Sequence, residues 1–184
     1  MADFALATDR LILRGWRDED HGALLALCRD PRVMEFLGPP LNAEQVALAI
    51  SRWRAKQATY GHCFWAVERR ADGAMLGFCG LQPGPEDTPI AGRIEIGWRL
   101  RADAWGQGYA REGAQASLAW AWTHLDTDSV WAITVPANMR SWGLMERLGM
   151  ARRADLDFDH PAVPIESPLR RHITYSIDRP GAHG

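Results

Sequence analysis

The sequence predicts one α/β domain of the α+β kind, built on a mixed sheet. Residues 93–100 alternate between apolar and other side chains, as a strand with one buried face does. A glycine-rich turn and an alanine-rich segment ending near Leu125 follow directly, which predicts a helix after that strand. Earlier in the chain, Asp72-Gly73 separates two apolar runs and signals a β-hairpin.

In the first half of the chain we expect one strand, two helices and then this hairpin. Residues 10–17 show the alternation of a strand. Asp18 is a candidate N-cap for a helix that Pro31 ends or bends, and Asn42 can cap a second helix that runs to about Thr59. The two strands of the hairpin are expected at residues 63–69 and 75–81.

In the second half we expect the alanine-rich helix, a strand at 130–135 and a helix from Asn138 to Leu148, with Gly149 as its C′ residue. Two more strand candidates, 151–158 and 172–177, are separated by a proline-bearing loop. This gives six to seven strands and about four helices in a single domain, residues 1–184, with a core at about 9–178.

Composition excludes several classes of function. The chain has 184 residues, 47% of them hydrophobic, and no apolar run long enough to span a membrane. A formal net charge of -2 without a basic stripe argues against nucleic-acid binding. The chain start lacks the pattern of a secretory signal, and Cys28, Cys63 and Cys79 have neither zinc-site nor disulfide spacing. We therefore expect a cytoplasmic protein without a metal or a membrane partner.

The turn Gly106-Gln107-Gly108-Tyr109-Ala110 is the first candidate binding element. Its small residues allow a ligand to approach the backbone, and amides at a helix start have no intrahelical partners, so a diphosphate could bind there. The alternative is a tight turn that merely connects a strand to a helix. A P-loop is excluded because no Lys-Ser or Lys-Thr follows, and Arg111 stands where a dinucleotide fingerprint needs glycine.

Two motifs resemble the GNAT superfamily of N-acetyltransferases. The run IEIGWRLRADAWGQGYAREG contains the family's glycine pattern, with Gly108 and Ala110 in its last two places. Trp105 stands where the family usually has Gln or Arg. The bacterial branch that includes the ribosomal-protein amino-terminal acetyltransferases (RimJ/RimL-like) shares this departure, and the sequence resembles that branch most closely. The run NMRSWGLMERLGM resembles the second motif, and the match covers about residues 92–150. The residues that fit the second motif are Asn138, Ser141, Glu146, Gly149 and Met150.

The resemblance implies acetyl-CoA as co-substrate and a sheet that is splayed at the acyl-CoA site. The diphosphate would lie on the amides of 106–110, and the pantetheine arm would pair with the strand Trp98, Arg99 and Leu100. Asn138 and Ser141 would line the far side of the arm. The side chain of Arg111 either reaches a phosphate of CoA or is a surface residue.

Glu95 is the candidate base that takes the proton of the amine. It lies on the strand face opposite the apolar residues. The alternative is that Glu95 pairs with Arg93 or Arg99 on a solvated face.

Many relatives protonate the leaving thiolate with a tyrosine at the place that Met145 occupies here, and methionine has no proton to give. Ser141 is the nearest replacement. Either Ser141 protonates the thiolate, or its hydroxyl only binds the backbone or CoA. In a third alternative, the thiolate leaves without an acid from the protein.

The sequence therefore predicts an acetyl-CoA-dependent N-acetyltransferase that acts by direct attack of a primary amine. The amine would belong to a peptide, a protein N-terminus or a small molecule. The alternative is a non-catalytic acyl-CoA-binding module with the same fold. Acceptor recognition would fall on the loops 32–41 and 155–171, neither of which carries a readable code, and the protein would be a monomer or a homodimer.

Overall fold

The computed structural model describes residues 4–181, which fold into two compact units. The first unit contains the residues up to Gln82 together with Gly97–Ser117, and the second contains Pro83–Ile96 and the residues from Leu118 onward. Strand β5 (Ile94–Leu100) and helix α4 (Tyr109–His124) each contribute residues to both units. The two units are described separately.

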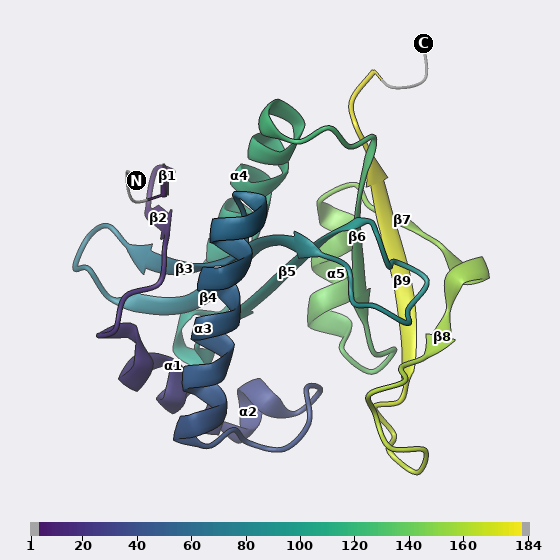
Figure 1. Ribbon diagram of the computed structural model, residues 1–184, viewed down its shortest axis with the longest axis horizontal. Helices are drawn as coiled ribbons and strands as arrows, with labels where there is room; N and C mark the ends of the chain where they lie inside the picture. Colours follow the sequence, from purple (N-terminus) through teal and green to yellow (C-terminus); the bar gives the residue numbers. More distant parts are fainter. Residues whose placement is uncertain (1–3, 182–184) are drawn as a thin grey trace. The chain divides into compact units, whose positions relative to one another are not determined.

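In the first unit, strands that are neighbours in the sheet are antiparallel, and helices α1, α2 and α3 lie between the second and third strands of the chain (Figure 1). Strand β1 pairs with β2, β2 with β3, and β3 with β4. The strands are β1 (Ala5–Ala7), β2 (Leu11–Arg14), β3 (Phe64–Arg69) and β4 (Met75–Pro83), and the helices are α1 (Asp20–Arg29), α2 (Pro31–Met34) and α3 (Ala43–Tyr60).

Helix α3 shows how local sequence sets the element boundaries. Asn42 and Gln45 form a reciprocal capping box at its start, and Gly61 ends it in the left-handed conformation with φ 77°. Trp53 then packs against Trp16 and Phe78, with ring centroids 4.8 Å apart in both pairs. The helix is therefore fixed to the sheet of the first unit by aromatic packing.

A buried ion-pair network joins β2, β3 and α1. Arg14 and Asp20 are 5% and 3% exposed, and their two hydrogen bonds are both 2.8 Å long. The Nε of Arg14 also donates to Glu68, at 2.7 Å. Burial alone would raise the pKa of Asp20, but hydrogen bonds from Arg14 and the Arg17 amide outweigh it and hold that pKa below its ordinary value.

In the second unit, the start of β5 lies parallel to β6 (Ser129–Thr134), with Glu95 beside Trp131. Strand β9 (Arg171–Asp178) is antiparallel to β6 and also pairs with β7 (Ala151–Arg152) and β8 (Phe158–Asp159). Helix α5 (Met139–Arg147) follows β6, and Gly149 lies just after it with φ 85°. The predicted α/β fold class with a mostly antiparallel sheet is thus confirmed, while the splay remains a prediction.

The structure differs from the sequence-based expectations at four places. Helix α1 starts at Asp20 after Glu19, so the expected N-cap at Asp18 is wrong. Strand β1 and helix α2 were not expected. The expected strand 151–158 is instead β7, a 3-10 turn and β8, because Asp157 turns inward to accept bonds from Arg152 and the Thr174 amide. Nine strands and five α-helices result within residues 4–181, and none of these helices is long and apolar enough to cross a membrane.

The buried network gives a test of stability. Asp20→Asn should lower the free energy of unfolding by roughly 3 kcal/mol, because it removes one partner of a buried arginine. The control Asp18→Asn should cost less than about 1 kcal/mol, since that carboxylate is 91% exposed in its pair with Arg54. Because the pKa of Asp20 is lowered by folding, its contribution should be present above about pH 4 and lost as the pH falls further. Urea unfolding at several pH values measures both effects, and equal losses in the two variants would contradict this account.

Candidate active site

The turn between β5 and α4 has a backbone conformation that requires glycine at two positions. A 3-10 turn, Ala102–Ala104, leads from β5 into it, and the indole of Trp105 donates to the Leu100 carbonyl at 2.9 Å. Gly106 and Gly108 have φ values of 73° and 82°, in the left-handed region where residues with a Cβ are strained. The turn therefore depends on glycine at both positions.

The amides of this turn are available to a ligand. The first helical bond of α4 runs from the Glu112 amide to the Gly108 carbonyl. Within residues 4–181, the amides of 106–111 donate to no carbonyl or side chain. Residues 106–108 are exposed. Unpaired amides at the positive end of a helix form a site for an anion.

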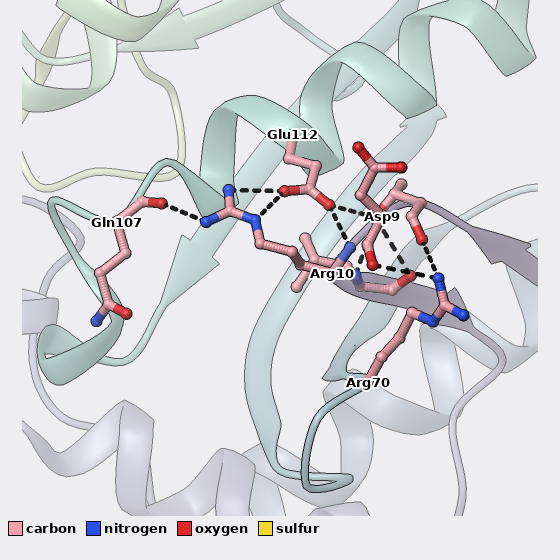
Figure 2. A network of polar contacts seen from close by, with 7 residues as sticks. Asp9, Arg10, Arg70, Gln107 and Glu112 are labelled. Carbon is pink, nitrogen blue, oxygen red and sulfur yellow. Dashed lines mark hydrogen bonds and ion pairs between the residues drawn. The ribbon is translucent and has the colours of Figure 1, made fainter.

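An arginine from the N-terminal segment holds this turn (Figure 2). Arg10 donates from Nη1 to the Gln107 carbonyl at 2.9 Å and from Nε to Glu112 at 2.7 Å, and its guanidinium lies 4.6 Å from the ring centroid of Tyr109. Glu112 also accepts the hydroxyl of Thr8, at 2.6 Å. The sequence-based reasoning missed these contacts because Arg10 and Gln107 are 97 positions apart. The only available signal was an acidic residue in the first turn of α4.

The strand residues before the turn have different surroundings. Trp98 and Arg99 are half-buried, and Leu100 is 5% exposed. The Arg99 guanidinium contacts the sulfur atoms of Cys28 and Met34, and within the described residues its Nε has no hydrogen-bond partner. Burial lowers the pKa of Arg99.

Glu95 lies in the part of β5 that belongs to the second unit. It is 9% exposed, so the alternative of a solvated face does not hold for it. Its neighbour on β6 is Trp131, and the guanidinium of Arg93 lies 3.8 Å from the centroid of that ring. Glu95 is thus a carboxyl group in partly apolar surroundings.

Helix α5 carries the residues of the second motif. The side chain of Asn138 accepts the Ser141 amide at 3.3 Å and so caps the helix. Ser141 is half-buried, in the first turn of α5. Met145 is 2% exposed and belongs to the core of the second unit, so no proton donor could stand there without repacking.

The predicted site residues fall into two groups. The first unit contains Trp98, Arg99 and Leu100, the turn 106–110 and Arg111, which is exposed. The second unit contains Glu95, Asn138 and Ser141. Residues 4–181 contain no cluster of three or more acidic, histidine or cysteine side chains that could hold a metal ion.

Comparison with known proteins identifies the family of the chain. The model of the acetyltransferase (GNAT) domain matches residues 10–151. The chain is 30% identical over 182 residues to the FsC-acetyl coenzyme A-N(2)-transacetylase of Aspergillus fumigatus, covering 95% of this chain and 76% of that protein.

Solved structures share the fold. An acetyltransferase from Agrobacterium tumefaciens has a TM-score of 0.77 at 25% identity, over 96% of this chain and 95% of that one. RimL, a ribosomal L7/L12 alpha-N-protein acetyltransferase in complex with coenzyme A, has a TM-score of 0.76 at 13% identity, over 95% and 98%. The family uses acetyl-CoA as its acetyl donor. The chain is an acetyltransferase and belongs to the GNAT family.

Proposed function

We propose that the protein transfers the acetyl group of acetyl-CoA to a primary amine of a peptide, a protein N-terminus or a small molecule, by direct attack of the amine on the thioester. The observation that carries this proposal is the turn 106–111, whose amides are unpaired within the described residues while its backbone is fixed. Such a turn suits the diphosphate of CoA. The named relative, an N(2)-transacetylase, supports an amine as acceptor.

Direct attack needs no nucleophile on the protein, and two of the three cysteines are unsuited to form an acyl-enzyme. All three are buried, and burial raises the pKa of Cys63 and Cys79 to about 12. Both therefore remain thiols at neutral pH, whereas a cysteine nucleophile must be a thiolate.

The reaction forms a bond from the amine nitrogen to the acetyl carbonyl carbon and breaks the bond from that carbon to sulfur. We assign to Glu95 the removal of the amine proton, directly or through a water. We assign to the Ser141 hydroxyl the donation of a proton or a hydrogen bond to the departing thiolate. The backbone amide near Trp98 would stabilise the oxyanion of the intermediate.

The direct test is release of free thiol from acetyl-CoA with a panel of peptides, cationic peptides and small amines. We expect thiol release that depends on a primary amine, with the acetylated amine identified by mass spectrometry. Binding of CoA without turnover on any amine would instead support the acyl-CoA-binding module.

A matched pair of glycines tests the role of the turn. Gly106 and Gly73 have φ values of 73° and 70°, and a Cβ at either would meet no atom within 4 Å. Alanine should therefore cost a similar amount of stability at both positions, about 1 kcal/mol or more. Only Gly106→Ala should also reduce the rise in melting temperature that CoA produces, because its Cβ would lie in the diphosphate turn. Equal CoA effects in the two variants would remove the turn from the binding site.

Glu95→Gln tests the base. Turnover should fall by roughly 100-fold or more while CoA affinity stays nearly unchanged, and the loss should shrink as rising pH supplies free amine. Glu86→Gln, an exposed carboxylate in the same unit, is the control and should have no effect. The measurement is steady-state kinetics of both variants from neutral to alkaline pH. An unchanged turnover of Glu95→Gln at neutral pH would show that Glu95 is not the base.

Ser141→Ala separates an acid from a binding contact. If the hydroxyl acts as the acid, turnover should fall by about 10-fold to 100-fold. A rise in the Michaelis constant for acetyl-CoA with unchanged turnover would make Ser141 a binding residue only. Because Met145 is fully buried, Met145→Tyr should destabilise the fold and not rescue the serine variant.

A further inference from the structure

We propose that Arg10 is a positioning residue that directs the Gly108 amide of the turn toward the diphosphate of CoA. The inference rests on the proposed function of this turn and adds a residue that lies outside both sequence motifs. Arg10 comes from the segment before β2, and Gln107 and Glu112 come from the start of α4, so one side chain joins two distant parts of the first unit (Figure 2).

All three guanidinium nitrogens of Arg10 have protein partners. Nε and Nη2 both approach Glu112 Oε2 at 2.7 Å, and Nη1 donates to the Gln107 carbonyl at 2.9 Å. The guanidinium group is planar, so the two contacts with Glu112 also fix the direction in which Nη1 points. The carbonyl of Gln107 is therefore held toward Arg10.

This bond determines where the next amide points. The peptide between Gln107 and Gly108 is trans, so its carbonyl and its N–H point in opposite directions. With the Gln107 carbonyl directed at Arg10, the Gly108 N–H is directed away from Arg10. The left-handed conformation of Gly108, with φ 82°, then continues the chain into α4. Arg10 thus presents the Gly108 amide to a ligand on the opposite side.

The ion pair of Arg10 with Glu112 also reduces an electrostatic repulsion at the turn. Glu112 lies in the first turn of α4, where its negative charge would repel a diphosphate at the same helix end. Burial would raise the pKa of Glu112, but bonds from Thr8 and Arg10 hold it below its ordinary value, so the carboxylate is ionised at neutral pH. The charge of Arg10 offsets that of Glu112.

The segment that carries Arg10 is itself anchored. Arg70 donates from Nη1 to the carbonyls of Thr8 and Asp9, at 2.7 and 3.2 Å, and its amide donates to the Arg10 carbonyl at 2.9 Å. The backbone amide of Arg10 donates to Glu112 at 2.8 Å. These bonds explain how an arginine side chain that is 48% exposed can hold a defined position.

The test compares CoA with pantetheine, which keeps the thiol arm but lacks the diphosphate together with the 3′-phosphoadenosine. Calorimetric titration with CoA and with pantetheine is done for the parent, Arg10→Met and Arg10→Lys. We expect Arg10→Met to weaken CoA binding about 10-fold or more and to leave pantetheine binding unchanged, since the bond that orients the Gln107 carbonyl and the charge that offsets Glu112 are both lost. Lysine lacks the fork and should restore less than half of the loss on a logarithmic scale. Turnover at saturating acetyl-CoA should stay near the parent value while its Michaelis constant rises.

The control is Arg54→Met, which removes an exposed ion pair elsewhere in the first unit and should leave both affinities unchanged. Equal weakening of CoA and pantetheine by Arg10→Met, full recovery with lysine, or unchanged CoA affinity would each overturn the proposal. A parent that binds CoA no more tightly than pantetheine would instead contradict the proposed function of the turn.

Discussion

The site depends on one constraint, which is that the amides of residues 106–111 must be ordered without being bonded to the protein. Ordered backbone usually obtains its rigidity from the hydrogen bonds of these groups. Here other contacts supply it: two glycines in the left-handed region, the Trp105 indole on the Leu100 carbonyl, and Arg10 on the Gln107 carbonyl. Carbonyls are bonded and amides are left for a ligand, so the turn is organised before any anion arrives.

In the second unit, the proposed functional groups are side chains and not backbone amides. Glu95 is placed on a strand next to Trp131, where burial removes it from bulk water. Ser141 is placed by the N-cap of α5, with Asn138 bonded to the backbone of the helix. The groups proposed for proton transfer are therefore carried by regular elements, whereas the proposed phosphate site is backbone in a turn. Substitution of the Glu95 or the Ser141 side chain should accordingly affect turnover more than CoA affinity.

The sequence predicted the parts of this arrangement that local patterns encode. The strand at β5, the N-cap at Asn42 and the C′ glycine at 149 each depend on a few neighbouring residues, and the structure contains all three. The expected alternation of buried and exposed faces in β5 is incomplete, because Glu95 is buried as well as Ile96. Contacts between distant residues left no such pattern. Neither the bond of Arg10 to Gln107 nor the burial of Arg14 with Asp20 could be read from spacing, and the inward turn of Asp157 broke a segment whose alternation had predicted a strand. The roles proposed for Glu95 and Ser141 rest on the family resemblance and on their surroundings.

The central claim is that free backbone amides of the turn bind the diphosphate of CoA, and amide resonances report on this directly. The measurement is a titration of isotopically labelled protein with CoA and, separately, with pantetheine, followed by the amide signals and exchange rates of residues 106–111. The account predicts large shifts and slowed exchange at these amides with CoA and small changes with pantetheine. Saturating CoA binding that leaves the six amides unshifted and in rapid exchange would contradict it.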